Sequence, residues 1–231
     1  ISHADIDHFG GAIDVIDHLP VDRVVTTQHA RAVAASQINR ATDPPRAFGA
    51  SGELWLELTH RKVDIQFVEA GRRFPLGEAD VEVIWPPPGI SFEDDNDNSI
   101  AMSITVAGRR VLMTGDIQAE AIQHMIDHQY DLAADVTDLP HHGSFPPPAV
   151  AWLAKVNPQI VLQSTGPRRL RWDKWAYHLR GIVRYITARD GAVTLKIAHD
   201  GQIIVETFKA NRDNPFETPQ IETDWTGSSS K

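Results

Sequence analysis

Short apolar runs alternate with segments whose apolar residues recur at helical spacing, and this alternation predicts an α/β chain. The first part predicts a helix at residues 13–19 that ends at Pro20, a short buried strand at 23–27 and a second helix at about 30–38. Further strands are expected at 63–68, 81–85, 100–106 and 111–113, with a hairpin turn at Gly108-Arg109. Proline, glycine and acidic residues mark loops at 43–52 and 86–98.

The second half continues the pattern and ends in a hairpin. Apolar residues at helical spacing follow Gly115-Asp116, a buried strand is expected at 134–139, a helix at 149–156 and a strand at 160–163. A helix at about 175–185 and a hairpin of 193–198 with 203–208, turned at Asp200-Gly201, complete the pattern. We expect one domain over residues 1–208 and a polar C-terminal tail at 209–231.

Composition limits the chemistry that this chain can perform. The chain has 231 residues, 42% of them hydrophobic and 23% charged, which is typical of a globular protein. It has no cysteine, so disulfide-linked partners, thiolate metal sites and a cysteine nucleophile are excluded. Any metal ligands must be nitrogen and oxygen atoms, which suit zinc, manganese or iron. The net charge of -9 argues against broad electrostatic wrapping of nucleic acid.

The most informative motif is a cluster of four potential metal ligands at the beginning of the chain. His3, Asp5, Asp7 and His8 occupy six positions and lead into Gly10-Gly11. In a loop after a strand, alternate side chains diverge, so His3 and Asp5 can approach one ion while Asp7 and His8 turn toward a second. The alternative is a solvated polar turn in which Asp7 caps a helix through the glycine pair.

Two later polar clusters also follow predicted strands. In Thr114-Gly115-Asp116, the carboxylate can bridge two cations, or it can cap the helix that follows. The second cluster runs from Pro140 through the adjacent residues His141 and His142 to Gly143-Ser144. Adjacent histidines point in different directions, so one can bind a metal while the other orients it or contacts a substrate. The alternative for either histidine is a loop side chain bonded to solvent.

Taken in order, H-x-D-x-D-H, T-G-D and P-H-H-G-S resemble the motifs of the metallo-β-lactamase fold. The chain more closely resembles the C-terminal metallo-β-lactamase-like domain of the ComEC DNA-uptake proteins, because residues 96–100 and 187–193 also match that family's sequence of motifs. The resemblance covers residues 1 to about 208. It implies an αββα sandwich of the α/β (α+β) class whose N-terminal strands are missing from this chain. It also allows a membrane-embedded parent protein.

The resemblance further implies a dinuclear metallohydrolase that carries two divalent ions, zinc or manganese. His3, Asp5 and His142 would hold one ion, Asp7 and His8 the other, and Asp116 would bridge them. Such a pair acidifies water and neutralises charge that develops on phosphoryl oxygens. Asp7 would also act as the catalytic residue that receives the proton of the water.

Substrate contacts are expected from two segments near the metals. His141 and Ser144 lie in the second histidine motif. The segment after the strand at 160–163 is basic, and its cations are interleaved with Trp172 and Trp175; we assign substrate binding to Arg168, Arg169 and Arg171. Cations that neutralise phosphates and an indole that stacks on a base are the combination used for single-stranded nucleic acid. The alternative is a solvated helix face with two core tryptophans.

Two positions differ from the family pattern and leave other functions open. Asp5 stands where the superfamily usually has histidine, and Asp173-Lys174 stands where a late His-Pro is usual, with His178 out of register. The leading hypothesis is a phosphodiesterase or nuclease that acts on DNA or another phosphodiester. The alternatives are a metallohydrolase for a small ester, lactone or phosphocholine-type substrate, and a degenerate, non-catalytic binding domain.

Overall fold

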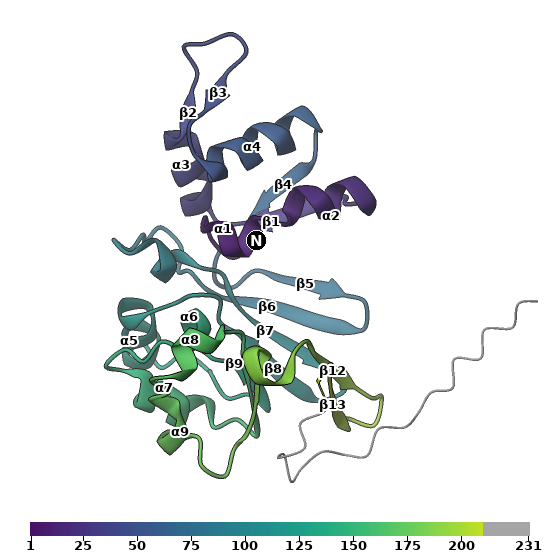
Figure 1. Ribbon diagram of the computed structural model, residues 1–231, viewed down its shortest axis with the longest axis vertical. Helices are drawn as coiled ribbons and strands as arrows, with labels where there is room; N and C mark the ends of the chain where they lie inside the picture. The colour runs from purple at the N-terminus through teal and green to yellow at the C-terminus, as the bar shows by residue number, and fades with distance from the viewer. Residues whose placement is uncertain (210–231) are drawn as a thin grey trace, which may run out of the picture.

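The computed structural model describes residues 1–209, in which a seven-stranded mixed sheet is the largest element (Figure 1). Its strand order is β11-β10-β9-β8-β7-β6-β5. Strands β8 to β11 are parallel to one another, whereas the pairs β5–β6, β6–β7 and β7–β8 are antiparallel. The strands are β5 (Arg73–Leu76), β6 (Ala79–Trp85), β7 (Ala101–Val106), β8 (Arg109–Met113), β9 (Val136–Asp138), β10 (Ile160–Gln163) and β11 (Val183–Ile186).

The N-terminal part forms a smaller unit around the parallel pair β1 (Arg23–Thr26) and β4 (Asp64–Phe67). The Thr27 hydroxyl accepts a hydrogen bond from the Ala30 amide and so caps the helix that follows β1. The other elements of this unit are α1 (Ile6–Phe9), α2 (Ala12–His18), α3 (Gln28–Ser36), α4 (Ala50–His60) and the short hairpin of β2 (Ile38–Asn39) with β3 (Arg46–Ala47).

Short helices connect the strands of the large sheet, and a hairpin follows its last strand. The helices are η1 (Asp95–Asn98), α5 (Ala119–Asp127), α6 (Pro140–Gly143), α7 (Ala149–Val156), α8 (Pro167–Leu170), α9 (Trp175–His178) and α10 (Thr187–Asp190). The hairpin pairs β12 (Val193–Ile197) with β13 (Ile203–Thr207).

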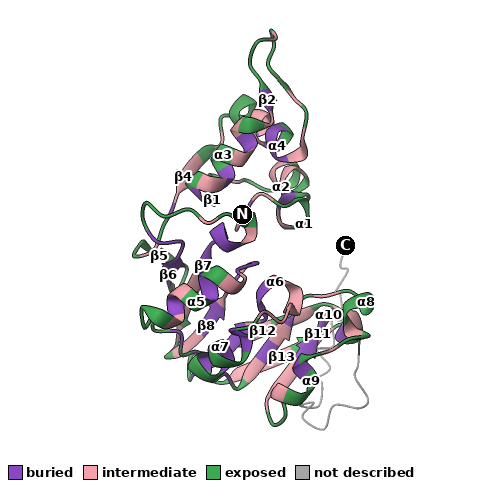
Figure 2. Ribbon diagram, turned by 90° about the vertical axis from the view of Figure 1, so that its left-hand side faces the viewer, coloured by how far each residue is buried: buried purple, intermediate pink, exposed green. Residues whose placement is uncertain are grey.

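Three apolar clusters join these elements into four layers (Figure 2). One cluster, which includes Phe9 and Leu58, packs α1, α2 and α4 on the β1–β4 pair. A second, which includes Val25 and Val83, lies between that pair and the large sheet. The third, which includes Trp152, packs α5 and α7 on the other face of the large sheet. The order helix, sheet, sheet, helix is the expected αββα sandwich of the α+β class.

Most of the predicted elements are confirmed. As predicted, Asp116 follows the carboxyl end of β8, and the pair His141 and His142 follows that of β9. Helix α4, strand β5 and helix α10 were not expected. The predicted helix at 175–185 is wrong: α9 ends at His178, Gly181 has a positive φ of 84°, and the chain then forms β11 at the edge of the sheet. Most of the expected C-terminal tail lies outside the described residues.

No helix among residues 1–209 combines the length and the apolar character that crossing a bilayer requires. This finding leaves the expectation of a membrane-embedded parent protein untested.

Leu112 in β8 offers a test of the packing between the large sheet and its helices. Its side chain is 1% exposed within the cluster that joins the sheet to α5 and α7. We expect Leu112→Ala to lower the free energy of unfolding by about 2–5 kcal/mol in urea titrations, because the truncation leaves a cavity. Leu76→Ala, at a position 63% exposed, should change it by less than about 0.5 kcal/mol. Equal effects of the two substitutions would contradict this description of the core.

Candidate metal centre

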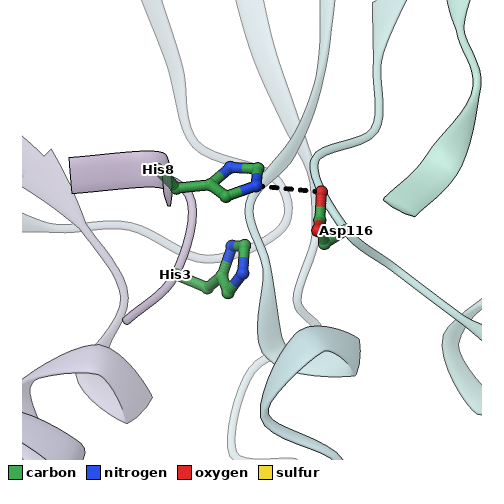
Figure 3. A group of neighbouring side chains, drawn as sticks. All are labelled: His3, His8 and Asp116. Atoms are coloured by element: carbon green, nitrogen blue, oxygen red, sulfur yellow. Dashed lines mark ion pairs between the residues drawn. The ribbon is translucent and has the colours of Figure 1, made fainter. Parts of the chain in front are cut away.

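The candidate ligands meet where the N-terminal segment lies against the large sheet. His3 and His8 come from this segment and α1, Asp116 from the loop after β8, and His142 from the loop after β9. Because β8 and β9 are parallel neighbours, their carboxyl ends lie at the same edge and bring these two loops together. Figure 3 shows His3, His8 and Asp116 facing one another; the side chains of His3 and Asp116 are 1% and 6% exposed.

Backbone hydrogen bonds fix the three ligand segments to one another. The Ile100 amide donates to the Ser2 carbonyl at 2.9 Å, and the His141 amide donates to the Gly115 carbonyl at 3.1 Å. The Asp116 amide donates to the Ser99 hydroxyl at 3.2 Å. The segment that the sequence singled out at residues 96–100 therefore serves as the common support of the N-terminal segment and the Asp116 loop.

The alternative reading of Asp116 as a helix cap is wrong. Helix α5 begins at Ala119, and the buried carboxylate of Asp97 accepts hydrogen bonds from the amides of Gln118, Glu120 and Ala121. Asp7 likewise does not cap a helix through the glycine pair, because it lies inside α1 while α2 has Gly11 at its N-cap. Both carboxylates are thus left for other chemistry.

Asp116 presents one carboxylate oxygen to each of two histidines. Its Oδ1 lies 3.2 Å from His8 Nε2, and its Oδ2 lies 3.4 Å from His142 Nε2. Two groups of ligand atoms each lie within 4.8 Å of one another, namely His3, His8 and Asp116, and Asp7, His8 and His142. This arrangement matches what a carboxylate that bridges two cations requires.

The imidazoles of His3 and His8 fit a metal better than they fit a network of hydrogen bonds. Among residues 1–209, both Nε2 atoms are buried and find no hydrogen-bond partner. The Ser2 hydroxyl oxygen lies 3.0 Å from His3 Nδ1 and 3.1 Å from His8 Nδ1, so it can accept a hydrogen bond from the Nδ1–H of each ring. With Nδ1 protonated, each ring keeps the lone pair of Nε2 free for a metal, and that of His8 lies 3.2 Å from Asp116 Oδ1.

The contacts of His142 also favour a bound cation. Its Nδ1 lies 2.9 Å from the Ser164 carbonyl oxygen, which only accepts, so Nδ1 carries a proton. Its Nε2 lies 3.0 Å from Asp7 Oδ2, an oxygen that also only accepts when ionised. Two facing acceptors need a proton or a cation between them. The nitrogen and oxygen donor set suits zinc or manganese.

The structure groups the ligands differently from the expected division. His142 lies with Asp7 and His8 rather than with His3 and Asp5. Asp5 is half exposed, and its Oδ2 lies 3.7 Å from His3 Nε2, outside both groups of ligand atoms. The N-terminal motif also does not follow a strand in the described residues, because its second half forms α1 and places Asp7 and His8 on successive helical positions.

The loop that carries His142 adopts an uncommon backbone conformation. His141 and His142 have positive φ values of 46° and 57°, which cost energy in residues with a Cβ. Gln163 Nε2 donates to the His142 carbonyl at 3.0 Å, and Trp175 Nε1 donates to the Gly143 carbonyl at 3.0 Å. Arg169 donates to the His141 carbonyl. These side chains stabilise a conformation that the local sequence alone disfavours.

The expected substrate-binding residues lie in different settings. His141 Nδ1 and Ser144 Oγ are buried and have no hydrogen-bond partner in the part of the chain that the structure describes, whereas Arg168 and Arg171 are exposed. His178 is not among the grouped ligands, because its ring stacks on Phe145 with 5.2 Å between centroids. We did not anticipate the supporting residues from the sequence; Ser2 and Gln163 carry no motif of their own.

Burial and charge shift the titration of several groups around the centre. Burial, followed by the positive potential of His8, lowers the pKa of His3, so this imidazole stays neutral and able to bind a metal. The pKa of Asp7 is lowered: partial burial opposes the shift, but a backbone hydrogen bond and the neighbouring His8 and His142 favour the carboxylate. Burial raises the pKa of Asp138 to about 6, although two hydrogen bonds from Thr114 act in the opposite direction.

A family model described as the metallo-beta-lactamase superfamily matches residues 1–163. This range is more than half of the chain, which therefore belongs to the metallo-β-lactamase superfamily. It is a superfamily with a hydrolase fold whose members usually bind divalent metals, and the grouped histidines and aspartates agree with that property.

Two curated proteins align with parts of this chain. Recombination protein 2 of Haemophilus influenzae is 25% identical over 209 residues, which are 90% of this chain and 22% of that protein. Uncharacterized protein YcaI of Escherichia coli is 27% identical over 127 residues, which are 51% of this chain and 16% of that protein. The chain thus spans less than a quarter of the length of either relative.

Solved structures are similar at low sequence identity. The CmlA beta-hydroxylase E377D mutant has a TM-score of 0.49 and 14% identity, with 80% of this chain and 42% of that chain covered. The metallo-beta-lactamase fold protein YhfI from Bacillus subtilis has a TM-score of 0.45 and 12% identity, with 89% and 76% covered. Similarity at this level carries no information on substrate.

The shared position of Ser2 under two imidazoles predicts an effect on metal affinity. Ser2→Ala removes the acceptor of both Nδ1 protons, and we expect affinity for zinc or manganese to fall about 10- to 100-fold in calorimetric titrations. The matched control is Ser36→Ala, whose hydroxyl donates to the Val33 carbonyl in α3 and is remote from the ligands. An unchanged affinity of the Ser2 variant would show that this hydroxyl does not orient the ligands.

The raised pKa of Asp138 predicts that Asp138→Asn increases the unfolding free energy of the metal-free protein, and that this increase grows with pH. Because the folded pKa of about 6 exceeds the unfolded value of 3.8, the carboxyl group loses stabilising effect as the pH rises through 6. Asparagine stays neutral and keeps the oxygen to which both Thr114 donors bond. The difference in unfolding free energy should widen in favour of the variant between pH 4 and 7, toward about 3 kcal/mol.

Urea titrations across this pH range measure that difference. Exposed Asp22→Asn is the control and should give a curve parallel to that of the wild type. A constant offset for Asp138→Asn at all pH values would refute the linkage.

Proposed function

We propose that this chain is a metal-dependent phosphodiesterase that acts on DNA. The observation that carries the proposal is Asp116, which offers one oxygen to the imidazole of His8 and the other to that of His142. Bound divalent ions supply a Lewis acid that acidifies water and neutralises charge on a phosphoryl group. In the proposal His3, Asp7, His8, Asp116 and His142 hold two ions, zinc or manganese, and Asp5 would join them only by moving from its place outside both groups.

The remaining roles belong to side chains at the mouth of the centre. Asp7 is exposed beside the other candidate ligands, and in the proposal its carboxylate accepts a proton from the attacking water. Arg169 and the unpartnered Ser144 hydroxyl are suited to bind phosphate oxygens.

Two observations favour DNA over a small substrate. The alignment with Recombination protein 2 covers 90% of this chain, and the name of that relative refers to a process of nucleic acids. The basic residues of segment 168–174 follow β10, next to the loop that carries His142, as a phosphate-binding surface requires. The context of the proposed activity is a ComEC-like one, in DNA uptake.

The test is hydrolysis by the purified chain after it has been loaded with manganese or zinc. We expect cleavage of single-stranded DNA and of the small diester bis(p-nitrophenyl) phosphate, and a loss of more than about 100-fold in both activities for Asp116→Asn. The control Asp131→Asn changes an exposed aspartate that pairs with Arg110, remote from the ligands, and should keep both activities.

Other outcomes would favour the other functions. Turnover of lactones, carboxylic esters or phosphocholine-type compounds, without cleavage of diesters, would replace DNA with a small substrate. Less than about one metal per chain after growth in supplemented medium, unchanged in Asp116→Ala, would indicate a non-catalytic binding domain.

A further inference from the structure

We infer that the cavity beside the metal centre is a subsite for one unpaired nucleotide of a single-stranded nucleic acid, whose base stacks on Trp172. The inference rests on the proposed function and names the form of its substrate. The cavity has a volume of about 230 Å³, and its lining includes Ser144, Gln163, Arg169, Trp172, Asp173 and Lys174.

The cavity is continuous with the loop that carries the candidate ligand His142. Gly143 and Ser144, which follow His142 directly, form one wall. Gln163 and Arg169 form part of the lining and also donate to the carbonyls of His142 and His141. A nucleic-acid strand bound across the metal centre would therefore meet this cavity at Gly143 and Ser144, the two residues that follow the candidate ligand His142.

The charges that line the cavity favour a phosphate. The carboxylate of Asp173 is engaged by the guanidinium of Arg184 through two hydrogen bonds of 2.6 and 3.0 Å. Arg169 and Lys174 then leave the cavity with a positive charge, although the net charge of the chain is -9. The exposed Arg168 and Arg171 extend this charge along the same segment.

The two tryptophans of this segment have opposite environments. Trp175 is 2% exposed and its indole nitrogen donates to the Gly143 carbonyl, so it supports the loop and is closed to a ligand. Trp172 is 84% exposed, and within residues 1–209 its ring stacks on no other aromatic ring. An exposed indole beside two cations is the arrangement on which bases of single strands stack.

The size and polarity of the cavity fit one nucleotide. Pockets that enclose a whole small molecule have about 300–1,000 Å³, so this open cavity of 230 Å³ suits one unit of a longer chain. The Ser144 hydroxyl, buried and without a partner, can bond a phosphate or sugar oxygen. Bases inside a duplex are already stacked on both faces and cannot use Trp172.

The test measures binding in the presence of EDTA, so that no cleavage interferes. We expect Trp172→Ala to weaken binding of a fluorescent oligothymidylate about 5- to 100-fold, as loss of one base stack requires, and to change binding of duplex DNA of equal length less than about twofold. Trp172→Phe should restore most of the affinity. The matched control is Tyr177→Ala, which removes another exposed aromatic side chain of the same segment outside the cavity lining. Oligouridylate in a parallel titration distinguishes RNA from DNA as the strand bound.

The outcomes separate this inference from the proposed function. Equal weakening of single-stranded and duplex binding, or no change in either, would overturn the subsite. Hydrolysis of bis(p-nitrophenyl) phosphate by the metal-loaded wild type tests the proposed function independently, because that diester has no nucleobase. Active hydrolysis with an unaffected Trp172→Ala variant refutes the subsite alone. A selective loss of single-strand binding in a chain that hydrolyses no diester supports the subsite and refutes the catalytic proposal.

Discussion

The candidate centre depends on the contact between the N-terminal segment and the large sheet, because its ligands come from both. The Ile100 amide anchors the Ser2 carbonyl, and the nitrogen of Ile1 donates to the Val25 carbonyl at 3.0 Å. The apolar cluster of Val25, Val83 and Ile100 lies beneath this contact. Each hydrogen bond contributes only about 1 kcal/mol, so burial of these apolar side chains must supply much of the stability of the contact.

The contact between the N-terminal segment and the large sheet also supplies hydrogen bonds to the polar groups of the centre. The buried imidazole of His3, the partly buried imidazole of His8 and the buried carboxylate of Asp116 are unfavourable away from water. Ser2 and Ser99 compensate in part, since their hydroxyls bond the rings and the Asp116 amide. Within residues 1–209 both Nε2 atoms make no hydrogen bond, and a bound cation would satisfy them, so metal binding should stabilise the folded chain.

Much of the fold could be predicted because apolar periodicity and loop residues are local signals. The strands at 100–106 and 111–113, the turn between them and the loops after β8 and β9 all follow from such signals. Strand β11 could not be predicted in this way, because its sequence is compatible with a helix and only pairing with β10 selects the extended form. Helix α4 was missed because the loop predicted at 43–52 overlaps its first turn; its apolar side chains pack against the β1–β4 pair.

The candidate site could likewise be predicted only as far as local sequence signals reach. The sequence identified the residues that form two groups of ligand atoms, since histidine and aspartate at these spacings are conspicuous. It could not give the grouping of His142, which depends on two positive φ values that side chains distant in sequence stabilise. It also could not distinguish Trp172 from Trp175, because exposure is decided by the surrounding fold.

In the proposed function and the inferred subsite, the parallel half of the large sheet places metal ligands and substrate contacts on loops that are one strand apart. The loops after β8 and β9 carry Asp116 and His142, whereas the loop after β10 carries the cations and Trp172. Substitutions in the β10 loop can therefore alter which substrate is selected while the ligand atoms remain unchanged. Gln163 and Arg169 limit this independence, because each takes part in both tasks. Evolution of new specificity on this scaffold should therefore vary positions 170–174 freely and change these two side chains rarely.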